Sequence, residues 1–313
     1  MQNIISVRDI IKQLSKSGLQ IGDKSILHYH IKNFNFNTFV YGYSDPFYVD
    51  KQNKRYDRDA NSNEMINLYK FDRDMSNHIL RYILVIEKII NTNVAYSIIN
   101  HFDLRDKCLF KLNQTYIQEK VLPNLRDVEP RVTYSIFIKK LIKYLPSSNI
   151  TKHYCKRNIY DDVLKWKECP LDIMCLTWSF ATSFSIFISL PNDARISLLS
   201  NFDLSPEHYE GFIVFLKNTL HLRNYISHNN VIYNTEIACQ SPSLINLYEC
   251  VFNKSVSNIR LLHMMELIEH FSHSTTLVSN TRYYLSKLKV QQKFKDKIQL
   301  YEDMVNGQKT LQE

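Results

Sequence analysis

The chain has 313 residues, of which 44% are hydrophobic, so it can bury a sizeable core. Its formal net charge is +8 and its isoelectric point is about 9.0, a basic excess that suits a phosphate-rich partner without requiring one. The six cysteines include no Cys-x-x-Cys pair, and the N-terminus lacks the apolar segment of a signal peptide, which argues against a disulfide-rich secreted protein. We therefore expect a cytoplasmic protein with free, buried thiols.

Glycine is scarce, with five residues in the chain and none between Tyr43 and Glu210. This excludes Gly-rich phosphate loops and dinucleotide fingerprints from most of the chain. It also disfavours tight hairpins and favours long helices. The composition therefore predicts a mainly α-helical fold.

Residues 1–60 are expected to form an N-terminal extension packed on the core. A helical stretch in this extension is followed by an aromatic, Asn-rich stretch. Its rings are expected to form a short strand or loop on the core; they are Phe34, Phe36, Phe39 and Tyr41.

A long amphipathic helix is predicted between Glu64 and Ile99, because this stretch contains no glycine or proline. Apolar residues recur there at steps of three, four or seven, which places them on one face. They are Leu68, Met75, Ile79, Tyr82, Ile86 and Ile90. Asn61 or Ser62 is suited to cap the start of the helix.

Two basic clusters follow, each with aromatic residues among the lysines and arginines. Between Arg131 and Lys167 there are nine Lys or Arg residues against two acidic ones. The second cluster, near the C-terminus, comprises Arg282, Lys287, Lys289, Lys293, Lys295 and Lys297. Basic residues bind backbone phosphates while aromatic rings stack on bases. From the first cluster we take as RNA-binding candidates Lys139, Lys140, Lys143, Lys152, Lys156 and Arg157. Either cluster taken alone also fits a solvated helix face.

The most apolar run, Leu171 to Leu190, is interrupted by polar residues, so we expect a buried core helix and no membrane span. Ser205-Pro206-Glu207 is typical of a helix start. The helix that follows is predicted to bury Phe212, Phe215, Leu216, Thr219, Leu222 and Ile226. A further helix is predicted over about 257–271. We expect a helical core over 61–275 with a basic insertion around 105–167, then a basic C-terminal helix and tail over 276–313.

The end of the helix after Pro206 carries the residues best suited to chemistry, Arg223, Asn224 and His228. Residues four apart lie on one helix face, so Asn224 and His228 are neighbours. Arg223 points elsewhere in an ideal helix, so its long side chain or local unwinding must bring it to the same place.

These side chains suit RNA cleavage without a metal. The reaction removes the 2′-hydroxyl proton, protonates the leaving 5′-oxygen and stabilises charge on phosphorus. Histidine can act as base or acid, arginine can clamp phosphoryl oxygens, and asparagine can orient either group. One copy supplies one such histidine, whereas two copies facing each other in a homodimer would supply both a base and an acid.

The R-N-x-x-x-H pattern resembles the HEPN nucleases. Other blocks extend the resemblance, and they are Tyr41-Gly42-Tyr43, Pro46-Phe47, Leu68 to Asp74, Ile86-Glu87, Pro170 to Phe187 and Leu222 to Asn234. Together they are similar to the Abi family of abortive-infection proteins, of the AbiD and AbiF kind, over about residues 35–270.

The resemblance implies a HEPN-type helical bundle that degrades RNA in anti-phage defence. It also implies a toxin-antitoxin arrangement in which a partner, in some systems a small non-coding RNA, restrains the enzyme. The chain departs from the family pattern at Asn229, where the family has a second histidine, and at Val231, where it has an arginine. Asn91 replaces an arginine often found after the helical glutamate, Glu87.

Other interpretations remain open. Arg223 and His228 could simply complement a helix C-terminus. Asp72, Arg73 and Glu87 could form a buried ion-pair network or line an RNA groove, and we count Arg73 and Asn229 as further RNA-binding candidates. His28 and His30, and later His263, His270 and His273, have no acidic or cysteine partner at ligand spacing, so we expect no metal and no cofactor. The alternative functions are a non-catalytic RNA-binding or dimerisation module and a membrane-acting toxin.

Overall fold

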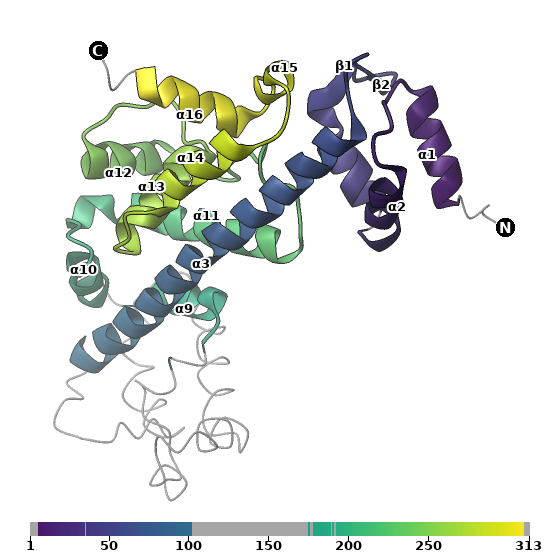
Figure 1. Cartoon of the computed structure of the whole chain (residues 1–313). Helices are drawn as coiled ribbons and strands as arrows, with labels where there is room; N and C mark the ends of the chain where they lie inside the picture. Colours follow the sequence, from purple (N-terminus) through teal and green to yellow (C-terminus); the bar gives the residue numbers. More distant parts are fainter. Residues whose placement is uncertain are drawn as a thin grey trace, which may run out of the picture. The chain divides into compact units, whose positions relative to one another are not determined.

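The computed structural model describes residues 6–34, 36–101, 175, 178–188, 190 and 192–309, with side chains excepted at 101 and 306–309. Within these residues the protein is mainly α-helical and has a single two-stranded antiparallel sheet, which confirms the predicted fold class (Figure 1). The predicted basic insertion around 105–167 lies outside the described residues.

The chain divides into two compact units. Unit 1 comprises Met1–Tyr82, His221–Ala238 and Ile259–Glu313, and unit 2 comprises Ile83–Leu220 and Cys239–Asn258. Helix α3 (Ser62–His101) and helix α11 (Tyr209–Ser227) each contribute one part to each unit.

Unit 1 begins with two capped helices that pack against each other, α1 (Val7–Lys16) and α2 (Lys24–Asn33) (Figure 1). The Ser6 hydroxyl accepts the N–H of Asp9, and the Asp23 carboxylate accepts the N–H groups of the first turn of α2. These contacts satisfy main-chain donors that a helix start leaves without partners.

The aromatic stretch after α2 is neither of the forms that we expected. It is a π-helix, η1 (Asn37–Tyr41), followed by a 3-10 turn, η2 (Asp45–Phe47). The strands come later, as β1 (Tyr48–Asp50) and β2 (Arg55–Tyr56). Phe39 is fully buried whereas Tyr41 is exposed, because a helical turn, unlike a loop laid flat on the core, points its rings in different directions.

Helix α3 confirms the predicted helix and its stripe, since all six stripe residues are buried. At its start, the Asn61 side chain accepts the N–H of Asn63 at 2.8 Å. Over 62–100 α3 is long and apolar enough to cross a membrane, and among the described residues it alone passes this test. However, 56% of its most apolar window is buried inside the protein, as in the core helix of many soluble proteins. The run that we had taken as most apolar is a short helix, described below.

Four helices complete unit 1: α13 (Leu261–Phe271), α14 (Leu277–Lys287), α15 (Gln292–Lys295) and α16 (Gln299–Lys309). Helix α13 packs against α14 and α16 and buries Met264, Met265 and Ile268. It begins later than predicted, because His263 Nδ1 accepts the N–H of Arg260 and so caps the helix there.

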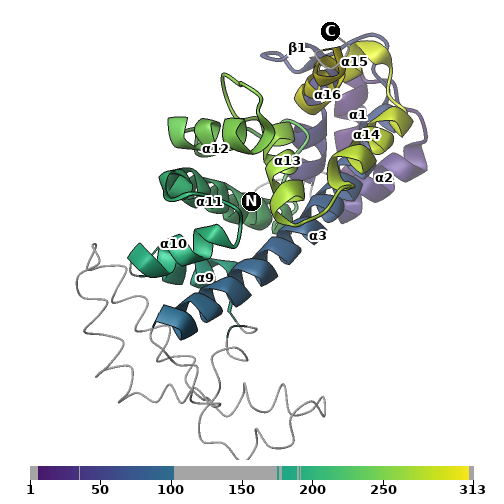
Figure 2. The same ribbon diagram turned by 90° about the vertical axis from the view of Figure 1, so that its left-hand side faces the viewer.

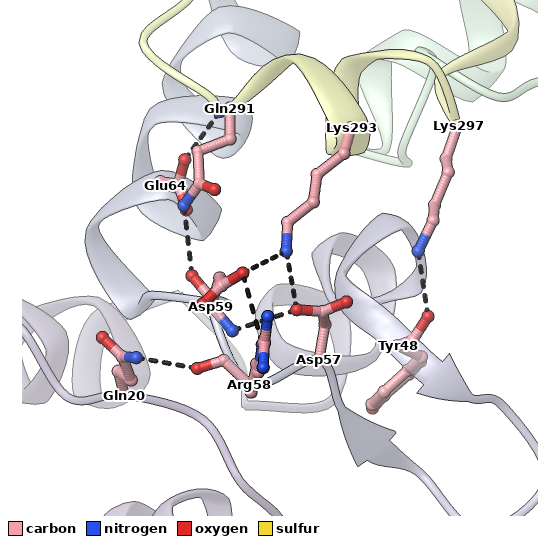
Figure 3. A network of polar contacts seen from close by, with 9 residues as sticks. All are labelled: Gln20, Tyr48, Asp57, Arg58, Asp59, Glu64, Gln291, Lys293 and Lys297. Carbon is pink, nitrogen blue, oxygen red and sulfur yellow. Dashed lines mark hydrogen bonds and ion pairs between the residues drawn. The ribbon is translucent and has the colours of Figure 1, made fainter.

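The segment containing α15 is fastened to the N-terminal part of unit 1. Figure 3 shows the Lys293 ammonium between the carboxylates of Asp57 and Asp59, at 2.8 and 2.6 Å. Gln291 donates to Glu64, and Lys297 donates to the carbonyl of Tyr48 (Figure 3). Two lysines of the C-terminal basic cluster therefore make internal contacts.

Unit 2 contains α9 (Phe180–Phe187), α10 (Asn192–Ser200), η6 (Pro206–His208) and α12 (Pro242–Phe252) with its parts of α3 and α11. Figure 2 shows the first part of α11 between α12 and α10. The six residues predicted to point inward from this helix are all buried.

The predicted core helix of 171–190 is shorter within the described residues, because the Ser179 side chain caps its start. Of the three cysteines described, Cys175 is buried, Cys239 is half-buried and Cys250 is exposed. The expectation of buried thiols is therefore wrong for Cys250.

Candidate active site

Helix α11 ends in a tight turn that contains a residue in the left-handed backbone conformation. The N–H of Asn229 bonds to the carbonyl of Ile226 at 2.9 Å, and the N–H of Asn230 bonds to that of Tyr225 at 3.3 Å. This pair of bonds is a Schellman motif, which requires a residue with positive φ after the helix. Asn229 fills that position with a φ of 57°, a conformation that asparagine adopts more readily than most residues. The helix therefore ends at a defined place, Ser227, with His228 as the residue that caps it.

The three predicted catalytic residues lie on this helix end, within unit 1. The N–H of His228 bonds to the carbonyl of Asn224 at 3.1 Å, so the two residues are one turn apart. Arg223 Nη1 donates to Asn224 Oδ1 at 3.4 Å. Arg223 is half-buried, while Asn224 and His228 are exposed. The imidazole of His228 has no hydrogen bond to another residue in the described part of the chain, and is accessible from solvent.

The main chain that follows His228 is held by a buried carboxylate, that of Asp72 on α3. Asp72 Oδ1 accepts the N–H groups of Ile232 at 3.0 Å and Tyr233 at 2.8 Å. Its other oxygen accepts the phenol of Tyr43 at 2.7 Å and the guanidinium of Arg73 at 2.6 Å. The side chain is fully buried, so these four bonds replace the water that it loses on folding.

Arg73 extends this network to the Schellman turn. Its Nη2 donates to the carbonyl of Asn230 at 2.5 Å, and its Nη1 donates to Asn229 Oδ1 at 3.4 Å. Burial opposes the charge of Arg73, but nearby Tyr43 and Asp72 outweigh it and raise its pKa. The guanidinium therefore stays charged while it fastens the turn.

Two phenols and a glycine complete this anchor. Burial raises the pKa of Tyr43, and the Asp72 carboxylate raises it further, so Tyr43 stays protonated and donates. Burial and Asp72 likewise raise the pKa of Tyr233, whose hydroxyl donates to the carbonyl of Gly42 at 3.0 Å. A Cβ on Gly42 would lie 2.6 Å from Val231 Cγ2, so only glycine allows this close approach. We call Gly42, Tyr43, Asp72, Arg73 and Tyr233 the loop anchor.

The loop anchor contains two of the three charged residues for which the sequence left two roles open. Asp72 and Arg73 form an ion pair between a buried carboxylate and a half-buried guanidinium, but both lie on α3, so the pair is not the buried network between helices considered for them. Glu87 is not in this network. It lies in unit 2, where its Oε1 accepts the N–H of Phe180 at the start of α9. Asn91, one turn further, donates to the carbonyl of Trp178, so both residues hold that helix start.

Of the predicted RNA-binding residues, the structure brings together Arg73 and Asn229, while the other six lie outside the described residues. Sequence reasoning assigned no role to Tyr43, Gly42 or Tyr233. A signal was present, since Asp72 follows Leu68 and precedes Met75 at the spacing of the buried stripe. An acid in such a position needs buried partners. In the described residues, no three His, Cys, Asp or Glu side chains are grouped as metal ligands.

Comparison with models of known protein families identifies the family of this chain. The family model described as Abi-like protein matches residues 29–234, which is about two thirds of the chain. The chain belongs to the Abi-like protein family. Comparisons with curated proteins and with solved structures gave no significant match. The matched range of this Abi-like protein includes the whole loop anchor and ends one residue after Tyr233, so the anchored helix end lies at the C-terminal limit of the family region.

Proposed function

We propose that this Abi-like protein is a metal-independent endoribonuclease of the HEPN type that acts in abortive-infection defence against phage. Family membership supports the defence role. The observation that carries the catalytic role is the end of α11, where Arg223, Asn224 and an exposed His228 lie on a main chain fixed by buried hydrogen bonds. A fixed backbone is one requirement of a preorganised catalytic group, since it determines where the imidazole of His228 starts from.

In the proposed reaction His228 exchanges protons with the substrate. The 2′-oxygen of the ribose loses its proton to a base, attacks the adjacent phosphorus and displaces the 5′-oxygen, which takes a proton from an acid. The products are a 2′,3′-cyclic phosphate and a 5′-hydroxyl. Arg223 binds the phosphoryl oxygens as negative charge builds on them, and Asn224 orients the guanidinium with which it is in contact.

The AbiD or AbiF subtype, the HEPN-type bundle and a homodimer belong to the same proposal. A dimer would place two His228 side chains at one phosphodiester, one as base and one as acid. Activity should then fall on dilution below the dimer dissociation constant, and mixing Arg223→Ala with His228→Ala subunits would test whether the site is shared. In the cytoplasm, restraint by a small non-coding RNA is compatible with the net charge of +8.

The decisive experiment compares the parent with Arg223→Ala and His228→Ala. We expect both variants to lose RNA cleavage and toxicity while RNA binding is largely kept. His221→Ala is the matched control, because His221 is an exposed histidine of the same helix that stacks on Tyr225, and it should stay active. If both variants remain as toxic as the parent, the nuclease is wrong and a non-catalytic RNA-binding or dimerisation module is the better account.

A further inference from the structure

Three rings form a partly exposed surface on unit 1, which we call the aromatic strip: Tyr29, Phe34 and Tyr69. Tyr29 and Phe34 have ring centroids 6.1 Å apart, and Phe34 and Tyr69 have centroids 5.2 Å apart. Tyr29 is 57% exposed and Phe34 is 37% exposed. Single exposed rings are common on protein surfaces, but rings grouped into one patch mark a candidate interaction surface.

Buried rings contact the aromatic strip on its inner side and hold it in place. Tyr69 packs edge-on against Phe39 at 5.4 Å and against Tyr43 at 5.2 Å, and both of these rings are fully buried. His30, also buried, contacts Tyr29 and Phe34 and is fixed by a 2.9 Å hydrogen bond to the carbonyl of Ile26. A platform held in this way loses little conformational entropy when a ligand stacks on it.

The strip leads to the candidate active site. Tyr69 and Arg73 are one turn apart on the same face of α3, and the charge of Arg73 acts on the Tyr69 phenol. Arg73 in turn contacts Asn229 and Asn230, the two residues that follow His228. A strand bound at His228 could therefore continue along the strip.

The charges beside the strip suit a phosphate backbone. Lys32 is exposed one turn after Tyr29 on α2, which has no acidic residue after its capping Asp23, and Lys70 is exposed next to Tyr69. Asp74 is the exposed acid nearest along α3. Aromatic faces flanked by lysines are typical of surfaces that bind single strands, where bases stack and phosphates meet positive charge. A duplex hides its base faces, so the surface suits unpaired nucleotides.

We propose that Tyr29, Phe34 and Tyr69 stack unpaired bases of an RNA strand and so select single-stranded RNA for the site at His228. This inference rests on the proposed function, because selecting a substrate has a role only if the protein cleaves RNA. Binding to the strip can nevertheless be measured without cleavage. It assigns the substrate class, a flexible single strand, and adds a binding surface separate from the catalytic residues.

The test uses the full-length His228→Ala protein and an unstructured RNA oligonucleotide carrying 2-aminopurine at successive positions. Stacking quenches this fluorophore, so we expect quenching at a few adjacent positions only. Adding Tyr29→Ala should abolish quenching at one of those positions and weaken binding about fivefold or more, the loss expected for one base–aromatic stack. Binding of a fully paired duplex should be unchanged.

Tyr283→Ala is the matched control. Tyr283 lies on α14, is 58% exposed and has the Lys287 ammonium 5.5 Å from its ring centre, so it is an equally open tyrosine beside a lysine. It should leave RNA binding unchanged. Equal losses from both tyrosines, or none from Tyr29→Ala, would overturn the strip.

The same variants separate this proposal from the catalytic one. In the otherwise intact protein, Tyr29→Ala should raise KM for single-stranded RNA about fivefold or more and leave kcat nearly unchanged. If the parent cleaves RNA while Tyr29→Ala has no effect on KM or quenching, the proposed role of the aromatic strip is wrong and the proposed nuclease activity is retained. If the parent does not cleave RNA but quenching depends on Tyr29, the aromatic strip binds RNA as proposed and the proposed nuclease activity is wrong.

Discussion

Asp72 Oδ1 accepts the main-chain N–H of Tyr233 at 2.8 Å, a contact between residues 161 positions apart. This bond and its neighbours hold the chain directly after the candidate catalytic histidine.

Asp72→Asn should therefore destabilise the protein. The amide would present N–H donors to groups that are themselves donors, and Arg73 would lose its buried counter-charge. We expect unfolding free energy to fall by about 3 kcal/mol or more, as measured by urea denaturation. Asp74→Asn is the control, since Asp74 is exposed two residues away, and its effect should stay within about 0.5 kcal/mol. Equal effects would show that the four hydrogen bonds of Asp72 contribute little.

Gly42→Ala should crowd the loop anchor. The new methyl would lie 2.6 Å from Val231 Cγ2, and valine is stiff about its Cα–Cβ bond. Overpacking of this kind costs about 1–3 kcal/mol. Because Val231 lies three residues after His228, cleavage should fall as well. The double variant Gly42→Ala/Val231→Ala removes the clash and should recover most of the stability. A double variant no more stable than Gly42→Ala would contradict this account.

Asn229→Ala should weaken the helix stop, whereas Asn229→Gly should preserve it. The residue has a φ of 57°, which costs an ordinary L-residue about 1–2 kcal/mol and costs glycine nothing. Thermal unfolding would measure the difference. Both variants lose the side-chain contact to Arg73, so the comparison isolates the backbone conformation. Alanine and glycine variants of equal stability would argue against a strained position.

Stability should decline in mild acid through His78 on α3. Burial lowers the pKa of its imidazole, although a hydrogen bond to the main chain of Thr276 opposes the shift. The folded protein therefore binds fewer protons at His78 than the unfolded chain does. The resulting stability is present above the unfolded pKa of about 6.5 and is lost as pH falls below it. Unfolding of the parent and of His78→Gln, compared between about pH 7.5 and pH 5.5, should show a smaller decline in the variant.

Removal of metal ions should leave RNA cleavage intact. The proposed chemistry uses only side chains of the protein, so a chelator should not lower the rate. The products should end in 2′,3′-cyclic phosphate and 5′-hydroxyl, which end-specific labelling would identify. Magnesium-dependent cleavage that leaves 5′-phosphate would contradict the proposed roles of Arg223 and His228.

Sequence reasoning located the helices well where one face is buried along their whole length. The stripe of α3 and the inward residues of α11 follow from periodicity, because burial repeats with the helix. It failed at Asn37–Tyr41, where a π-helix forms, because aromatic composition does not specify backbone geometry. The positions of Arg223, Asn224 and His228 at a helix end were also foreseen.

The loop anchor could not be foreseen in detail. Its bonds join Gly42, Asp72 and Tyr233, and their pairing depends on tertiary packing between segments far apart in the sequence. What the sequence does contain is the acid on an apolar stripe, which signals a buried partner without naming it. The Schellman turn was equally hidden, since Asn229 marks it only once the helix end is known.

The loop anchor holds the chain that follows His228 through residues far away in the sequence, and this has a genetic consequence. If expression of the protein is toxic as proposed, surviving colonies should carry mutations in three separate stretches of the gene, which encode the end of α11, residues around 42–43 and residues around 72–73. Mutations around 42–43 and 72–73 would inactivate the protein by loosening the chain after His228, with Arg223, Asn224 and His228 themselves unchanged. Suppressors of substitutions at Gly42 should map to Val231, the side chain that a Cβ at position 42 would meet, and not to the histidine itself.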